Sequence, residues 1–280
     1  MSRPAPTVPT PGQAPRRSLA PFGRRRATVT RSRAVGAYRL FACRDPAGPA
    51  PRPGQFYMLA SARRWGGGDA ERPYLPRAFS YLRHAGDELE FLLEEVGPGT
   101  RRLAELRPGD ELCLVGPLGN GFSCPQGDRI ALLVGGGIGI VPLACWAEEL
   151  GSAARTLIGF RDAAHAAAAE LLVAPLVATD DGSVGHEGLA TDLLRWELES
   201  GASPVVYACG PLPMLEAVRG ICAEARIPAQ LAMESGMACG FGACFGCAVP
   251  TRRGLLRLCL DGPVLDAGDL ETALIPGTGH

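Results

Sequence analysis

The sequence predicts a β plus α/β protein, in which an antiparallel barrel is followed by a parallel α/β domain and a small cysteine-rich segment. Short β-like runs separated by Gly/Pro turns fill residues 27–125. Apolar strands alternate with helical stretches over residues 126–227, and residues 228–280 carry a tight group of cysteines. These ranges are the expected domains, and residues 1–26 are the expected tail.

Composition narrows the class of protein. A chain of 280 residues is long enough for two or three domains. A net charge of −1 excludes a strongly basic nucleic-acid binder. No run of 18 apolar residues occurs, so no membrane span is expected. Ten cysteines without a signal peptide indicate a reducing compartment, and we expect a cytoplasmic protein.

The tail is rich in Pro, Ala, Arg and Ser and has no apolar periodicity, so we expect it to be disordered. An Arg-rich leader with few acidic residues also resembles an organelle transit peptide. Its prolines oppose the amphipathic helix that such a leader requires.

Strand and helix signals divide the rest of the chain. Gly/Pro turns bound the strands expected in the barrel, at 34–43, 55–60, 78–83, 88–96 and 112–115, with a short helix at 101–106. The α/β domain is expected to have strands at 129–134, 156–160, 176–179 and 205–208, with helices at 141–150, 163–172, 189–198 and 213–225. Such alternation indicates a parallel sheet with both faces covered. The last strands are expected at 247–251 and 255–260.

The cysteine-rich segment carries the most specific motif. Cys239, Cys244, Cys247 and Cys259 follow the spacing C-x4-C-x2-C, then eleven residues, then C. This is the plant-type pattern for a [2Fe-2S] cluster held by four thiolates. Gly240, Gly242 and Gly246 let the loop adopt positive φ and bring its N–H groups close to the negatively charged sulfides. Two alternatives stay open at this point. Structural zinc sites usually show two C-x2-C pairs, and a disulfide knot would suit a secreted chain.

Two further motifs suggest anion binding. The loop 135–139 follows a strand and opens a helix, so Gly136, Gly137 and Gly139 would let a diphosphate approach the helix N-terminus. Ile140 stands where the third glycine of G-x-G-x-x-G belongs, so a tight structural turn is the alternative. Gly97-Pro98-Gly99-Thr100 also precedes a helix, and its alternative is a turn in which Thr100 is the N-cap.

Two more segments suit ligand contacts. In Arg77-Ala78-Phe79-Ser80, the Arg is a natural partner for phosphate and the Ser hydroxyl for a flavin ring nitrogen, although surface charge would also explain an Arg. Cys209-Gly210-Pro211 lies at the carboxyl edge of the expected sheet, where ligands bind, although a cysteine there also packs well. The remaining cysteines stand alone, the four histidines form no cluster, and we find no nucleophile–base triad.

Together these motifs resemble the ferredoxin–NADP reductase superfamily. The segments 237–247, Met-Ala-Cys-Gly-x-Gly-Ala-Cys-x-x-Cys, and 259–264, Cys-x-Asp-Gly-Pro-Val, are similar to the electron-transfer subunits of NAD-dependent dihydroorotate dehydrogenase. The resemblance covers about residues 27–270. The family often has Arg-Pro-x-Ser where this chain has Arg-Ala-Phe-Ser. The resemblance implies a flavin-binding barrel followed by a nicotinamide-binding domain.

The resemblance also implies a role for each motif. Arg77 would meet the FAD diphosphate, and Ser80 with Phe79 would lie against the isoalloxazine, with Ala78 as the remaining member of this FAD-binding motif. The motif Gly97, Gly99 and Thr100 would hold the FAD phosphates or ribityl chain. The set Gly136, Gly137 and Gly139 would face the NAD diphosphate, and Cys209, Gly210 and Pro211 would lie near the nicotinamide. The four cysteines of the C-terminal motif would bind the cluster.

The implied function is an electron relay in pyrimidine biosynthesis. A separate FMN-containing catalytic subunit would oxidise dihydroorotate, and electrons would pass through [2Fe-2S] and FAD to NAD+. The expected assembly is a heterotetramer of two copies of each subunit. The alternatives are a reductase subunit of a hydrogenase, sulfur-reducing or transhydrogenase complex, and a zinc-stabilised regulatory or binding protein.

Overall fold

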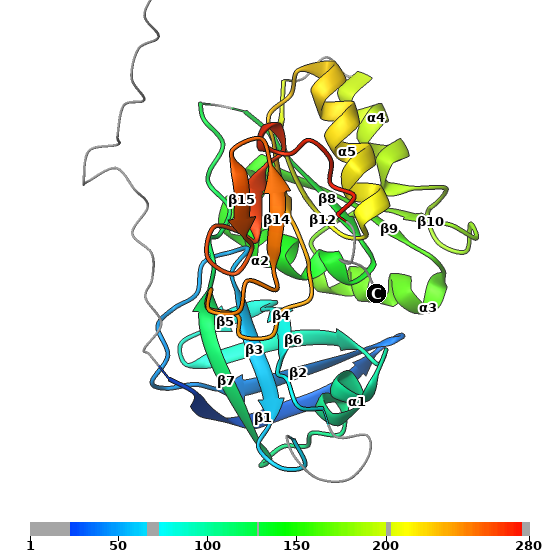
Figure 1. The fold of residues 1–280 in the computed structure, drawn as a ribbon. Coiled ribbons are helices and arrows are strands. Elements are labelled where there is room, and N and C mark those ends of the chain that lie inside the picture. Colours follow the sequence, from blue (N-terminus) through cyan, green and yellow to red (C-terminus); the bar gives the residue numbers. More distant parts are fainter. Residues whose placement is uncertain (1–22, 66–72, 128, 200–202, 276–280) are drawn as a thin grey trace, which may run out of the picture.

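The structure is a computed structural model that describes residues 23–65, 73–127, 129–199 and 203–275. Within these ranges the chain forms two large sheets and one hairpin (Figure 1). The first sheet lies below the second in this view, and the orange loop before the hairpin descends to the first sheet. Most of the expected tail lies outside the described residues. Its last two residues are already in a strand, which begins at Arg25.

The first sheet is antiparallel, with the strand order β4-β3-β7-β1-β2-β6-β5. Its strands are β1 (Arg25–Val35), β2 (Tyr38–Arg44), β3 (Phe56–Ser61), β4 (Arg77–Ser80), β5 (Arg83–Ala85), β6 (Glu88–Glu94) and β7 (Glu111–Leu118), and its helix is α1 (Pro98–Ala104). Aromatic side chains fill its core. The Phe41 and Phe91 rings stack with centroids 5.4 Å apart, and the Tyr57 ring meets Phe91 edge-on at 5.6 Å.

Two strands expected in this sheet are divided in the structure. The expected strand at 34–43 was wrong, because it spans a hairpin in which Val35 pairs with Tyr38. Gly36 adopts φ +54° at this turn, a backbone conformation that favours glycine. The expected strand at 78–83 is divided between β4 and β5. Apolar periodicity did not reveal these breaks, because Val35 and Tyr38 flank the first one and Tyr81 and Leu82 lie within the second.

The second sheet has the order β11-β10-β9-β8-β12-β13-β16. Its strands are β8 (Ala131–Gly136), β9 (Ala154–Phe160), β10 (Leu176–Thr179), β11 (His186–Glu187), β12 (Val205–Cys209), β13 (Ala229–Ala232) and β16 (Val264–Asp266). Its helices are α2 (Ile140–Leu150), α3 (Ala163–Ala166), α4 (Ala190–Glu199) and α5 (Leu212–Ala225), with 3-10 turns η1 (Gly137–Gly139), η2 (Gly151–Ala153), η3 (Ala167–Leu171) and η4 (Ala267–Asp269). All its neighbouring strands are parallel except β16, which is antiparallel to β13.

Successive side chains of β8 point to opposite faces of this sheet, as strand geometry requires. Leu132 and Val134 pack with residues of α4 and α5, while Leu133 packs with residues of α2 on the other face. The core on the α2 face also contains Tyr38 and Leu92 of the first sheet. Side chains of both sheets therefore pack together in this core, in addition to the separate aromatic core of the first sheet.

The segment after residue 227 contributes to both the second sheet and the cysteine loop. Strands β13 and β16 lie in this segment, so the sheet extends beyond the expected boundary at 227. Between them the chain forms the hairpin of β14 (Ala248–Thr251) and β15 (Gly254–Arg257). The strand expected at 255–260 was too long, because β15 ends at Arg257 and Cys259 lies in the following turn. No described helix has the length and apolar character needed to cross a membrane.

Candidate functional site

The four cysteines of the C-terminal motif are arranged as two pairs. The Cys247 and Cys259 sulfurs lie 3.2 Å apart, and both residues are buried. Cys239 is hydrogen-bonded to the side chain of Cys244, which is exposed. One pair is therefore internal, and the other reaches the surface of the loop.

Backbone N–H groups of the loop converge on one thiol. Burial raises the pKa of Cys239, but N–H groups of Cys244, Phe241 and Ala243, together with the Cys244 side chain, lower it to about 6. An ordinary thiol has a pKa near 8.5, so the loop favours the thiolate, the form that binds metals. This is the arrangement of N–H groups that a negatively charged sulfur centre requires.

Two pairs of thiolates fit a two-iron cluster, because each iron takes two protein ligands. A structural zinc ion instead needs four ligands around a single point. The donor set therefore suits [2Fe-2S] better than zinc.

The cysteine loop is held by close packing and by one arginine. A Cβ atom on Gly242, which has φ +88°, would lie 2.8 Å from Leu260 Cγ, so glycine is required there. The Arg257 guanidinium donates to the Gly242 carbonyl at 3.1 Å and lies 4.8 Å from the centre of the Phe245 ring. Phe245 itself adopts φ +58°, an unusual conformation for a phenylalanine.

The cysteine loop also packs directly on the first sheet. A Cβ on Gly240 would overlap Met58 Cγ of β3 and would lie 3.2 Å from Leu118 Cδ1 of β7. Asn120, just after β7, donates its side-chain N–H groups to the Leu260 and Asp261 carbonyls at 3.1 and 3.0 Å. These contacts fix the position of the turn that carries Cys259.

The predicted FAD residues of two elements meet on the first sheet. Arg77 of β4 packs over Gly99 of α1, where a Cβ would lie 2.8 Å from the Arg77 Nε atom. The Arg77 Nη1 atom donates to the Leu75 carbonyl at 2.7 Å, and Arg77 makes no ion pair with any described residue. Its other donors thus stay available for a phosphate, which fits the diphosphate of FAD.

The Gly97–Thr100 turn has fewer free hydrogen-bond donors than the sequence suggested. The Thr100 hydroxyl accepts from the N–H groups of Val96 and Gly97 at 2.9 and 3.0 Å. The N-cap of α1 is Gly97, and Thr100 is the third residue of the helix. Thr100 therefore satisfies the turn, and the Gly97 N–H does not point freely at an anion. On β4, Ala78 is exposed, while Phe79 and Ser80 are half-buried.

The predicted NAD residues meet at the carboxyl edge of the second sheet. In register, Cys209 of β12 lies opposite Gly135 of β8. A Cβ on Gly139 would overlap the Cys209 carbonyl oxygen and would lie 2.8 Å from Gly210 Cα. A Cβ on Gly136 would lie 2.8 Å from Pro211 Cδ. The two loops can therefore pack this closely only because Gly136 and Gly139 have no side chains.

Sequence reasoning missed Glu234, a carboxylate that lies near Cys209 at this edge. Burial raises the pKa of the Cys209 thiol well above its ordinary value, and the nearby Glu234 carboxylate raises it further. Glu234 lies two residues after the end of β13, a strand that we did not expect from the sequence. Had that strand been assigned, its carboxyl end would have placed Glu234 at the ligand edge.

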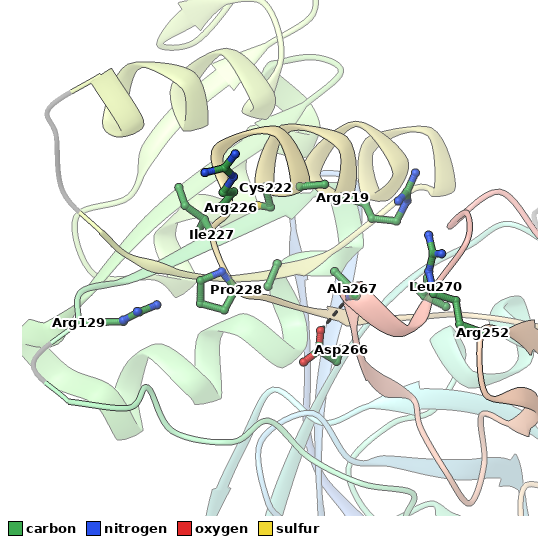
Figure 2. A pocket seen from close by; sticks show the side chains of 13 residues that line it. Arg129, Arg219, Cys222, Arg226, Ile227, Pro228, Arg252, Asp266, Ala267 and Leu270 are labelled. Atoms are coloured by element: carbon green, nitrogen blue, oxygen red, sulfur yellow. Dashed lines mark hydrogen bonds between the residues drawn. The ribbon is translucent and has the colours of Figure 1, made fainter. Parts of the chain in front are cut away.

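A cavity of about 570 Å³ lies at the opposite edge of the second sheet (Figure 2). Its lining includes Ala229 at the start of β13, Arg226 at the C-cap of α5 and Arg129 before β8. The C-terminal end of a helix carries partial negative charge, which explains the arginines beside α5. None of the predicted cofactor residues lines this cavity, so it is separate from them.

The fold and these sites define a class of flavin- and nicotinamide-linked oxidoreductase subunits with an iron–sulfur segment. A ferredoxin–NADP+ oxidoreductase dependent on NADH, described for flavin-based electron bifurcation, has a similar structure, with a TM-score of 0.75. It is 22% identical, and the match covers 88% of this chain and 90% of that one. A ferredoxin NADP+ reductase from Neisseria gonorrhoeae, solved with FAD and NADP, aligns with a TM-score of 0.55 and 19% identity, over 72% of this chain and 91% of that one. These likenesses confirm the predicted fold class.

Sequence comparison identifies the family. Residues 234–271 match the iron–sulfur cluster binding domain of dihydroorotate dehydrogenase B. The dihydroorotate dehydrogenase B (NAD(+)) electron transfer subunit of Bacillus caldolyticus is 38% identical over 267 residues, covering 89% of this chain and 99% of that protein. The subunit of the same name from Caldanaerobacter subterraneus is 36% identical over 230 residues, covering 80% and 88%. The chain belongs to this family of electron transfer subunits, as its motifs predicted.

Proposed function

We propose that this chain passes electrons from a dihydroorotate-oxidising catalytic subunit to NAD+, in the synthesis of pyrimidines. The [2Fe-2S] cluster would move single electrons, nicotinamide takes a hydride, and FAD exchanges with both. In this proposal the four cysteines of the C-terminal motif hold the cluster. Arg77 to Ser80 hold FAD together with Gly99 and Thr100 at the start of α1, and the loops 136–139 and 209–211 hold NAD.

One observation carries the proposal, namely the packing of the cysteine loop on the first sheet. Gly240 of the loop lies against Met58 of β3. Met58 is the register partner of Ala78 on β4, the strand that carries Arg77 and Ser80. Only one strand therefore separates the cysteine loop from the predicted flavin strand. A short path of this kind is what electron transfer between two centres requires.

The surface of the cysteine loop suits a partner protein. Phe241 and Phe245 are 51% and 62% exposed, and Cys244 of the same loop is also exposed. Exposed aromatic side chains are typical anchors of protein interfaces. We propose that this face meets an FMN-containing catalytic subunit, in an assembly with two copies of each chain. All ten cysteines are unpaired, which fits a reducing compartment such as the cytoplasm.

Reconstitution tests this function. The chain is mixed anaerobically with a dihydroorotate-oxidising FMN subunit from the same cells, and the mixture is separated by gel filtration. We expect the two chains to elute together and to reduce NAD+ with dihydroorotate, whereas neither chain does so alone. A stable complex that reduces NAD+ no faster than the separate subunits would contradict the proposal.

The flavin residues lead to a separate prediction. Replacing Arg77 with alanine should weaken FAD binding by about 2 kcal/mol or more, roughly thirtyfold in Kd, because a charge-assisted phosphate contact is lost. Isothermal titration of the apoprotein with FAD measures this change. Arg107→Ala is the matched control, since Arg107 is an exposed arginine of the same sheet domain and lies outside the predicted site. Unchanged FAD affinity in a folded Arg77→Ala protein would remove Arg77 from the site.

A further inference from the structure

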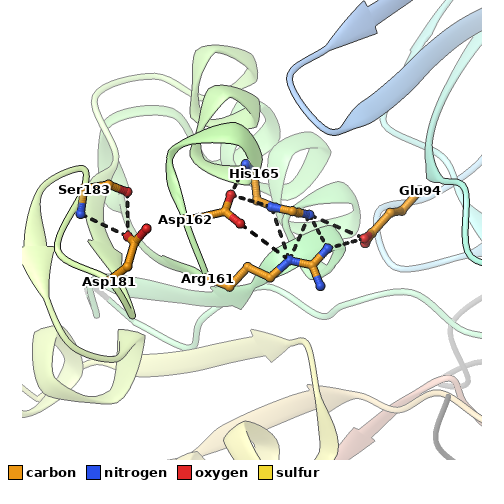
Figure 3. A network of polar contacts seen from close by, with 6 residues as sticks. All are labelled: Glu94, Arg161, Asp162, His165, Asp181 and Ser183. Atoms are coloured by element: carbon orange, nitrogen blue, oxygen red, sulfur yellow. Dashed lines mark hydrogen bonds and ion pairs between the residues drawn. The ribbon is translucent and has the colours of Figure 1, made fainter.

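A network of charged side chains joins the two sheets beside the predicted NAD site (Figure 3). Arg161, directly after β9, donates from Nη2 to the Glu94 carboxylate of β6 at 2.6 Å. His165 is buried between them, with Nδ1 2.6 Å from Asp162 Oδ1 and Nε2 3.4 Å from Glu94 Oε1. The guanidinium of Arg161 is thus held by a carboxylate from the other sheet, and its Nε atom also lies 3.0 Å from His165 Nε2 and 3.9 Å from Asp162 Oδ2.

This network lies where the adenosine half of a dinucleotide is expected to bind. Gly135 and Gly136 pair in register with Ile158 and Gly159, so the end of β9 adjoins the glycine loop. In nucleotide-binding sheets of this kind, the group after the second strand faces the ribose next to the adenine. A carboxylate there binds the 2′-hydroxyl of NAD, and a free arginine accommodates the 2′-phosphate of NADP.

The charges at this edge favour the hydroxyl. Asp162 follows β9, and Asp180 and Asp181 follow β10. The ends of these two strands are adjacent, because the Asp180 N–H donates to the Phe160 carbonyl at 2.9 Å. Hydrogen bonds from His165, through its ring and then its N–H, lower the pKa of Asp162. The Ser183 hydroxyl and N–H do the same for Asp181, so both carboxylates are ionised at neutral pH. A 2′-phosphate, with about two negative charges, would meet them directly.

Arg161 is the cation that could offset the negative charge of those carboxylates, but it is already paired with Glu94. The Glu94 carboxylate, 2.6 Å from Arg161 Nη2, offsets part of the positive potential that the guanidinium would present to a phosphate. The pairing does not depend on the nucleotide, because both residues belong to the protein. The Glu94 carboxylate comes from β6 of the first sheet, whereas the glycine loop belongs to the second sheet.

We propose that Glu94 is a specificity-determining residue, which holds Arg161 and so restricts the dinucleotide site to cofactors with a free 2′-hydroxyl. This inference rests on the proposed function, since it assumes that the glycine loop at 136–139 binds a nicotinamide dinucleotide. It predicts that removing the Glu94 charge releases Arg161 toward a 2′-phosphate.

Titration of the FAD-loaded chain with NADH and with NADPH tests the inference. In Glu94→Gln we expect NADPH affinity to rise about tenfold and NADH affinity to change less than twofold. The double variant Glu94→Gln with Arg161→Gln should lose the gain, because the gain requires the arginine. Glu90→Gln is the matched control. Glu90 lies on the same strand and pairs with Arg31 and Arg83, so NADPH binding should stay at the wild-type value.

Arg161→Gln provides a second route that does not depend on the folding of Glu94→Gln, because Arg161 is exposed. Since Glu94 withholds Arg161 from the nucleotide, this variant should bind NADPH as the wild type does. If Glu94→Gln binds NADPH as weakly as the wild type while NADH binding persists, or if Arg161→Gln weakens NADPH binding, the inference is wrong. A wild-type chain that binds neither dinucleotide would instead contradict the proposed function.

Discussion

Replacing Cys247 with serine is expected to abolish dihydroorotate-driven NAD+ reduction in the reconstituted complex. Cys247 is buried with its sulfur 3.2 Å from that of Cys259, so one of the two thiolate pairs is lost. A serine hydroxyl is a harder and far less acidic ligand than a thiol, and it does not replace a thiolate on iron. Iron and acid-labile sulfide should therefore fall from two each per chain to background.

Electron transfer between NADH and the flavin should be unaffected by this change. The predicted FAD and NAD residues lie on other elements, so NADH should still reduce a dye at the flavin at the wild-type rate. Cys222→Ser is the control, because Cys222 is equally buried but lies in α5 outside the cysteine loop. Gel filtration must show that the Cys247→Ser chain still binds its partner. An associated complex without iron that reduces NAD+ at full rate would show that the cluster is structural.

Sequence reasoning worked best where chemistry restricts both residue type and spacing. The cysteine spacing predicted a two-iron cluster, and the structure groups those four cysteines in two pairs. The alternation of strands and helices predicted the second sheet, because β8 and β12 are buried on both faces and form continuous apolar runs. The predicted membership of the electron transfer subunit family was confirmed by the comparisons.

Features that depend on residues far apart in the chain could not be predicted in this way. Arg161 and Asp162 both follow β9, and their opposite charges argue in opposite directions for a 2′-phosphate. In the structure Arg161 pairs with Glu94, 67 residues earlier, a contact that no local pattern of the sequence indicates. Likewise β13 and β16 are too short for a clear period-2 pattern, and they become strands by pairing along the edge of an existing sheet.

Replacing Gly139 with alanine is expected to damage the predicted NAD site while leaving the flavin site intact. The added methyl group would overlap the Cys209 carbonyl oxygen and would lie 2.5 Å from its carbonyl carbon. Both are backbone atoms at the end of a buried strand, so neither can turn aside as a flexible side chain could. We expect a loss of about 2 kcal/mol in the free energy of unfolding, within the range for overpacking. The loops 136–139 and 209–211 would be forced apart.

Two measurements and one control separate this effect from any general effect of a glycine-to-alanine substitution on stability. NADH affinity should fall about tenfold in titrations, because the displaced loop carries the N–H groups at the start of α2. FAD content should match the wild type, because Arg77 and Gly99 lie in the other sheet domain. Gly220→Ala is the control: Gly220 lies in α5 with open space around its Cβ position, so alanine should stabilise the helix by up to about 1 kcal/mol. If Gly139→Ala unfolds at the wild-type denaturant concentration and binds NADH normally, the two loops do not form one site.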